Sequence, residues 1–228
     1  MTVWLVGQGA LPGILNAGAR PEWLRGAYTI QRSASVTATV QNVPVLNVRS
    51  LAACQVAPPA DFAWALYSQD STSENSVWEM TNIAEAHERA CAWLHSLGLR
   101  VITFPANDIV WKLPPVPDRD QYQAFISRNI AGQAARHADM AGVQSQGLTA
   151  SPEAFARYLR LASDQARSAS PGIPFFGGLA TERLGTPISA QQMHAAYRAA
   201  GTICDGYWIN VNRRPEVVVE FLSLVHSS

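Results

Sequence analysis

The sequence has few cysteines and no cluster of basic residues. Its three cysteines, Cys54, Cys91 and Cys204, are far apart and odd in number, so neither a disulfide framework nor a thiolate metal site is predicted. Seventeen basic residues balance seventeen acidic ones, and no run of Lys and Arg provides the electrostatic footprint of a nucleic-acid-binding protein. We therefore expect a reducing, cytoplasmic setting and no nucleic-acid partner.

Long hydrophobic runs are also absent. No stretch approaches the roughly 18 apolar residues that a membrane-spanning helix needs. The opening MTVWLVGQGALPG lacks the basic flank and the long apolar region of a signal peptide. We expect a soluble protein without a membrane partner, unless a leader has been removed.

Signals for metals and cofactors are weak. The five histidines form no HxxxH or HxH pair and lie in expected helices or at their ends: His87, His95, His137, His194 and His226. The glycine-containing stretches GQGALPG and GGLATERLG match neither a P-loop nor GxGxxG, and no GxSxG elbow is present. We expect neither a bound metal nor a cofactor.

Short apolar runs alternate with amphipathic helical patterns over most of the chain, which is typical of repeated βα units. From about residue 61 onward the expected strands lie in 61–70, 99–108, 140–147, 173–181 and 206–211. The helix in 151–170 begins with Ser151 as N-cap and Pro152 at its first position. A further helix begins with Ser189 and Gln192 in capping-box spacing and ends at Gly201. These runs predict five parallel strands.

The first 60 residues contain three further apolar runs, VWLVGQG, AYTIQRS and PVLNVRS. Eight strands predict a small (β/α)8 TIM-like barrel with an irregular N-terminal region, formed by residues 1–228 as a single domain. Only about ten residues separate Arg32 from Val43, whereas a parallel crossover usually needs a dozen or more. This segment is therefore expected to form a hairpin around Gln41 and Asn42, or a barrel unit that lacks its helix. An open doubly wound parallel sheet is the alternative fold.

Ligands of both folds bind at the carboxyl ends of the strands, and the runs end there in polar residues. Gln144 and Gln146 are two positions apart, so on a strand they would point to the same side, into the pocket. Trp111 follows a strand in a proline-rich segment, where it would serve either as part of a lid or as packing under a long loop. The expected substrate-binding residues are Arg32, Arg49, Asn107, Asp108, Trp111, Gln144, Gln146, Glu182, Trp208 and Asn210.

The loop LYSQDSTSENSVW places Asp70 and Glu74 directly after an apolar strand. Two carboxylates at a strand end suit general acid and base catalysis. The two consecutive glycines of GGLAT indicate a close approach to the backbone by a ligand or a neighbouring chain.

In layout, from the strand spacing to the tryptophan of GYWINV, the chain resembles barrel glycosidases. This favours a cofactor-independent hydrolase or lyase that acts on a small polar or glycosyl-like molecule. Two alternatives remain: an isomerase or cyclase directed by shape and hydrogen bonds, and a non-catalytic barrel that binds a ligand or a protein. The oligomeric state stays open, because the apolar C-terminal helix suits its own barrel or a second subunit equally.

Overall fold

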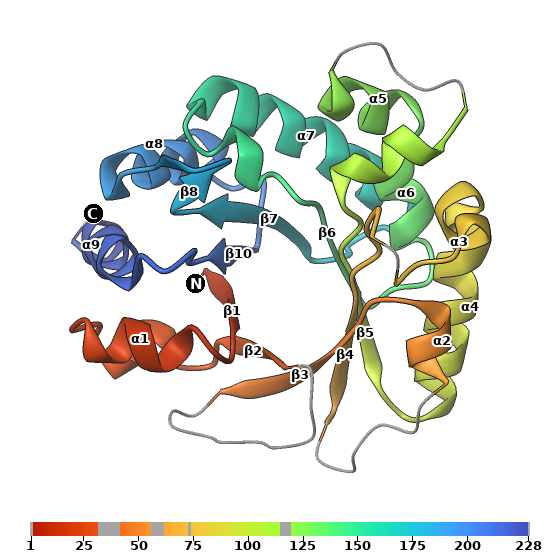
Figure 1. Ribbon diagram of the computed structural model, residues 1–228, viewed down its shortest axis with the longest axis horizontal. Coiled ribbons are helices and arrows are strands. Elements are labelled where there is room, and N and C mark those ends of the chain that lie inside the picture. Colours follow the sequence, from red (N-terminus) through yellow and green to blue (C-terminus); the bar gives the residue numbers. More distant parts are fainter. Residues whose placement is uncertain (1, 32–41, 56–61, 73, 115–119, 228) are drawn as a thin grey trace.

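The chain folds into a closed parallel barrel surrounded by helices (Figure 1). The computed structural model describes residues 2–31, 42–55, 62–72, 74–114 and 120–227. Around the barrel the strands follow the order β1-β10-β7-β6-β5-β4-β3-β2. Their bounds are Val3–Gly7 (β1), Tyr28–Gln31 (β2), Val43–Val48 (β3), Trp64–Tyr67 (β4), Arg100–Thr103 (β5), Met140–Gly142 (β6), Phe175–Ala180 (β7) and Gly206–Asn210 (β10). Each of the eight runs predicted as strands overlaps one of these strands.

Closure follows from the two neighbours of β1. Leu5 pairs with Tyr28 of β2 on one side, and Trp4 pairs with Tyr207 of β10 on the other, both in parallel. The sheet therefore has no free edge between its first and last strands. The (β/α)8 TIM-like barrel is confirmed, and the open doubly wound sheet is wrong.

The hairpin expected between β2 and β3 is also wrong. These strands pair in parallel, with Tyr28 opposite Val43 and Gln31 opposite Leu46. Both strands also pair in parallel with their other neighbours, so reversing β3 would break its register with β4. Residues 32–41, which include Arg32 and Gln41, lie outside the described part of the connection.

The helices between the strands follow the local signals of the sequence. The described helical segments are α1 (Leu11–Asn16), η1 (Pro21–Leu24), α2 (Leu51–Cys54), α3 (Val77–Thr81), α4 (Ile83–Ser96), η2 (Asn107–Lys112), α5 (Gln121–Ser127), α6 (Ile130–Ala135), η3 (Gln146–Leu148), α7 (Pro152–Ala169), α8 (Ala190–Ala200) and α9 (Pro215–His226). The capping box of α8 is present, because Ser189 Oγ accepts from Gln192 N at 3.2 Å and Gln192 Oε1 accepts from Ser189 N at 2.9 Å. On α7, an apolar face that includes Phe155 and Leu159 is buried.

Side chains fill the interior of the barrel. The inner cluster contains Leu5, Ile30, Val45, Trp64, Leu66, Ile102, Phe104 and Phe176, with Trp208 partly buried against it. Because these side chains occupy the centre, a ligand has to bind at one end of the barrel rather than within it. Phe104 and Trp208 meet edge to face, with ring centroids 5.1 Å apart.

The outer layer of the core lies between the strands and the helices. The C-terminal helix α9 buries Val218, Phe221 and Leu222 and packs against α1 and α8. Its apolar face therefore packs on its own barrel. From the sequence, packing on its own barrel or on a second subunit was equally expected. None of the helices in the described ranges is long and apolar enough to cross a membrane.

Candidate functional site at the mouth of the barrel

A pocket of about 400 Å³ opens at the carboxyl ends of β5, β6, β7 and β10. Six of the residues expected to bind substrate line it together: Asn107, Gln144, Gln146, Glu182, Trp208 and Asn210. They come from four separate stretches of the chain, and the parallel direction of the strands brings these stretches to one end. We call this cavity the mouth pocket.

Gln144 and Gln146 reach the mouth pocket from a loop, not from a strand. The strand β6 ends at Gly142, and Gln146 begins the short helix η3. Strand alternation, the basis of the prediction, therefore does not place them. They line one pocket because the loop after β6 is fastened to the neighbouring strand β7.

Two buried hydroxyl groups make this connection. Ser145 Oγ accepts a hydrogen bond from Gly178 N at 2.7 Å and donates one to Gly178 O at 2.9 Å. Thr149 Oγ1 donates to Gln146 O at 2.8 Å and accepts from Ala180 N at 3.2 Å. Ser145 thus satisfies two backbone groups of β7 and Thr149 satisfies one. Together they fix the backbone that carries the two glutamines.

The consecutive glycines of β7 leave space that a side chain of the same protein, Gln146, occupies. A Cβ at Gly178 would lie 2.4 Å from Cδ of Gln146, so only glycine lets this side chain lie against the strand. In the described structure the close approach predicted at these glycines comes from a side chain of the same molecule. A larger residue at 178 would displace the amide of Gln146 from its place in the mouth pocket.

Uncharged amides dominate the mouth pocket. Besides the predicted residues, Gln121, Tyr122, Gly147, Ala180, Arg183, Leu184 and Asn212 line it. Within the described residues, the side-chain amides of Asn107, Gln144, Gln146 and Asn210 make no hydrogen bond to protein. They are available to a ligand, and each amide offers both a donor and an acceptor.

One carboxylate and one guanidinium complete the lining. Glu182 and Arg183 form β8 (Glu182–Arg183), which pairs with β9 (Thr186–Pro187) in a small hairpin beside the pocket. Glu182 Oε1 accepts from Gly185 N at 3.2 Å, a contact inside this hairpin. Arg183 follows Glu182 at the carboxyl end of a predicted strand but was not among the expected binding residues. Nothing in the sequence pattern indicated that Tyr122 from α5 would reach the pocket, because its position depends on how separate segments fold over it.

The two carboxylates predicted to be catalytic lie close together because both form ion pairs with Arg49. Asp70 forms an ion pair with Arg49 through Oδ2, and Glu74 Oε1 lies 2.8 Å from Nη1 of the same side chain. Asp70 also accepts hydrogen bonds from Thr72 N at 3.0 Å and from Asn75 Nδ2 at 3.3 Å. None of the residues Arg49, Asp70 and Glu74 is among those that line the mouth pocket.

The surroundings of Asp70 favour its charged form. Burial alone would raise the pKa of this carboxyl, but the hydrogen bonds from Thr72 and the Arg49 guanidinium outweigh burial and hold the pKa below its ordinary value of 3.8. Asp70 is therefore an ionised acceptor held in an ion pair. This state suits a structural or general-base role better than proton donation.

Asp108 and Trp111 lie next to the mouth pocket without lining it. The carboxylate of Asp108 accepts from the hydroxyl of Ser71 at 2.7 Å and from its N–H at 3.3 Å, which ties the loop after β4 to η2. Trp111 is 39% exposed and donates from Nε1 to Gln121 Oε1 at 3.3 Å. Arg32 belongs to the residues that are not described.

A metal-binding cluster is not found in the part of the chain that the structure covers. No three His, Cys, Asp or Glu side chains lie close enough together there to hold an ion. His87 is fully buried, and both of its ring nitrogens lack a hydrogen-bond partner in the described structure. The polar side chains that line the mouth pocket are thus amides, one carboxylate, one guanidinium and the phenol of Tyr122.

Comparison with solved structures supports the barrel fold. Triosephosphate isomerase from Bartonella henselae superimposes with a TM-score of 0.56 at 8% identity, over 100% of this chain and 99% of the isomerase. A glucosidase from Croceicoccus marinus gives a TM-score of 0.47 at 10% identity, over 76% of this chain and 43% of the glucosidase. No protein-family model and no curated protein sequence matches the chain. At such identities the likeness to the isomerase concerns the (β/α)8 fold alone.

Proposed function

We propose that the protein is a cofactor-independent enzyme that acts on a small polar, glycosyl-like molecule bound in the mouth pocket. The observation that carries this proposal is the convergence of unpaired amides around Trp208 at the carboxyl ends of the strands. In (β/α)8 enzymes the active site lies at this end of the barrel. A pocket of about 400 Å³ falls within the size range of sites for small ligands.

The lining suits a neutral molecule with several hydroxyl groups. Each hydroxyl of a sugar both donates and accepts a hydrogen bond, as do the amides of Asn107, Gln144 and Asn210. The half-buried ring of Trp208 offers an apolar surface on which a sugar ring can stack. With one acidic and one basic side chain in the lining, the pocket has no excess of either charge.

Glu182 is the carboxylate that the pocket lining offers for acid and base chemistry. In the proposed hydrolase reaction a water molecule attacks the sugar carbon as the bond to the leaving oxygen breaks, and Glu182 takes up a proton from this water and passes it to the leaving oxygen. In the lyase reaction Glu182 takes the proton from the carbon next to the breaking C–O bond instead, a double bond forms, and the proton again goes to the leaving oxygen. The catalytic role of Asp70 and Glu74 stays a prediction. Their contacts with Arg49 favour a supporting role, in which they hold the loop after β4 in place.

A second candidate is an isomerase or cyclase that needs little proton transfer. The predominance of uncharged amides over carboxylates in the lining favours it. Such an enzyme would orient its substrate by hydrogen bonds and shape and would tolerate the loss of Glu182. A barrel that only binds its ligand would tolerate the same change and would show no turnover at all.

The test combines binding and turnover. Binding is measured by ligand-observed NMR with the methyl glycosides of glucose, galactose, mannose and xylose, both anomers of each. Turnover is followed by release of 4-nitrophenol from the matching 4-nitrophenyl glycosides. We expect Gln144→Ala and Trp208→Ala to abolish binding, and Glu182→Gln to keep binding while lowering turnover by about 10²- to 10⁴-fold.

Glu153→Gln, an exposed position on α7 outside the mouth pocket, is the matched control and should change neither quantity. Binding with no turnover would overturn the hydrolase proposal in favour of the binding barrel or the isomerase. If Asp70→Asn abolished turnover and Glu182→Gln did not change it, Asp70 in the loop after β4 would be the catalytic residue instead of Glu182. No binding of any glycoside would overturn the substrate class.

A further inference from the structure

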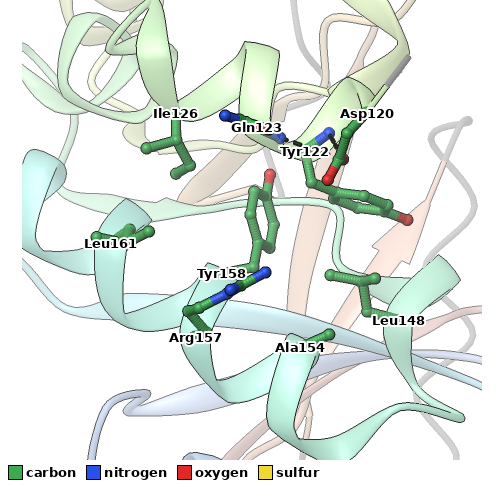
Figure 2. A pocket seen from close by; sticks show the side chains of 9 residues that line it. All are labelled: Asp120, Tyr122, Gln123, Ile126, Leu148, Ala154, Arg157, Tyr158 and Leu161. Carbon is green, nitrogen blue, oxygen red and sulfur yellow. Dashed lines mark hydrogen bonds between the residues drawn. The ribbon is translucent and has the colours of Figure 1, made fainter.

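A second cavity lies outside the barrel, between α5 and α7 (Figure 2). Its volume is about 320 Å³. Asp120, Tyr122, Gln123 and Ile126 line it from α5 and its N-cap, and Leu148, Ala154, Arg157, Tyr158 and Leu161 line it from η3 and α7. We call this cavity the aromatic groove.

The aromatic groove adjoins the mouth pocket. Tyr122 lines both cavities, and its hydroxyl lies on the backbone of Gly147, where a Cβ would come within 2.2 Å of the hydroxyl oxygen. Gln146 and Gly147 line the mouth pocket, while the next residue, Leu148, lines the groove. One tyrosine and one short turn therefore separate the two cavities.

The walls of the groove suit an apolar ring. Figure 2 shows Tyr158 in the middle, Tyr122 and Leu148 on one side, and Ile126 and Leu161 on the other. The rings of Tyr122 and Tyr158 meet edge to face with centroids 5.0 Å apart. Leu161 is 45% exposed, so part of its apolar surface at the groove is open to a ligand.

In the described structure, the hydroxyl of Tyr158 is a buried, unpartnered polar group beside the groove. Tyr158 is only 5% exposed, and its hydroxyl has no hydrogen-bond partner among the described residues. Figure 2 shows this hydroxyl directed toward α5, between the side chains of Ile126 and Tyr122. A buried hydroxyl without a partner costs free energy that a ligand carrying an acceptor would recover.

Charged groups stand at the edge of the groove without dominating it. The carboxylate of Asp120 is already used, because it accepts from Tyr122 N at 2.9 Å and from Gln123 N at 3.2 Å as the cap of α5. Arg157 is exposed and contributes one positive charge from α7. The two charges are opposite, so the groove favours neither an anionic nor a cationic ligand strongly.

We propose that the aromatic groove is a second subsite for the same substrate. It would hold an apolar, acceptor-bearing ring attached to the polar part that occupies the mouth pocket. The substrate class is then a conjugate of a glycosyl-like group with an aryl or similar apolar group. This inference rests on the proposed function, because it needs a polar group in the mouth pocket to which the ring is joined.

The experiment compares paired probes on the purified protein. Dissociation constants are measured in the Glu182→Gln background, which is expected to keep binding while slowing hydrolysis of the aryl probe. The two ligands are a methyl glycoside and the 4-nitrophenyl glycoside of the same sugar, whose nitro group is the acceptor. We expect the aryl probe to bind at least about tenfold more tightly. Ala154→Trp, which fills the groove, should remove this gain and leave the methyl glycoside unaffected.

Two further variants separate the subsite from an effect on folding. Tyr158→Phe keeps the ring and removes the hydroxyl, so it should lower the affinity of the aryl probe alone by about twofold to tenfold. Arg160→Trp, on an exposed position of α7 that does not line the groove, is the control for Ala154→Trp and should change nothing.

The outcomes distinguish the two proposals. If the methyl glycosides bind but the aryl probe gains nothing, or keeps its gain in Ala154→Trp and Tyr158→Phe alike, the second subsite is overturned and the proposed function stands. If no methyl glycoside binds, the proposed function itself has failed. An aryl gain that both groove variants reduce supports the subsite.

Discussion

The small hairpin at the mouth pocket contains a residue in a conformation unfavourable to its type. Leu184 has a φ of 46° and is followed by Gly185 with a φ of 81°. These two residues connect β8 to β9, a position where two-residue hairpin turns need positive φ and favour Asn or Gly. An L-residue with a Cβ pays about 1 to 2 kcal/mol in this left-handed region.

Burial does not offset this cost, because the side chain of Leu184 is 97% exposed. We therefore expect Leu184→Asn to raise the free energy of unfolding by about 1 kcal/mol, since Asn tolerates the left-handed region best after Gly. For a chain of this length that corresponds to a rise in Tm of roughly 2 to 4 °C. Urea unfolding at pH 7 and differential scanning calorimetry measure the two quantities.

Leu184→Ala is the matched control at the same position. It removes the exposed apolar side chain but keeps a Cβ in the left-handed region, so it should leave stability within about 0.5 kcal/mol of the wild type. If Asn and Ala stabilise the protein equally, the gain comes from losing an exposed leucine. Relief of backbone strain at Leu184 would then not be the cause of the stabilisation.

Three further predictions concern buried polar groups. Burial lowers the pKa of His87 from 6.5 to about 3, so the folded protein keeps this ring neutral and should lose stability as the pH falls from 6.5 toward 3. His87→Leu should abolish that part of the loss, as urea unfolding at pH 7 and pH 4 would show. Glu79 accepts hydrogen bonds from Leu51 N at 2.6 Å and Ser76 N at 2.9 Å. Glu79→Gln should therefore lower the free energy of unfolding in urea by about 1 to 3 kcal/mol. Glu85→Gln, at an exposed position, is the control and should lower it by less than about 0.5 kcal/mol. Asp70, whose pKa is held below 3.8, should contribute stability above that pH and lose it as the pH falls through its lowered pKa. The Asp70→Asn protein should be less stable than the wild type at pH 7, and its free energy of unfolding should change less as the pH falls. If the pH dependence of that free energy were unchanged, the ion pair would be contradicted.

The mouth pocket shows which site residues can be predicted from local sequence patterns and which cannot. Asn107, Gln144 and Asn210 were predicted because parallel strands bring their carboxyl ends together, a rule that needs only the order of the runs. Tyr122 was missed because it comes from a helix whose position over the pocket depends on contacts between separate segments. The reason given for Gln144 and Gln146 was wrong, although both residues line the pocket, because β6 ends at Gly142 and the Ser145 and Thr149 hydroxyls set the loop instead.

The sequence by itself determined the elements whose signals are local. The N-cap and capping-box residues of α7 and α8 and the eight apolar runs depend on neighbours a few positions away, so they can be read along the chain. Only the tertiary structure decided the parallel pairing of β2 with β3, the closure through β1 and β10, and the binding of Asp70 to Arg49. These features join residues far apart in the chain, and their free energy depends on distances and burial that exist only once the barrel has closed.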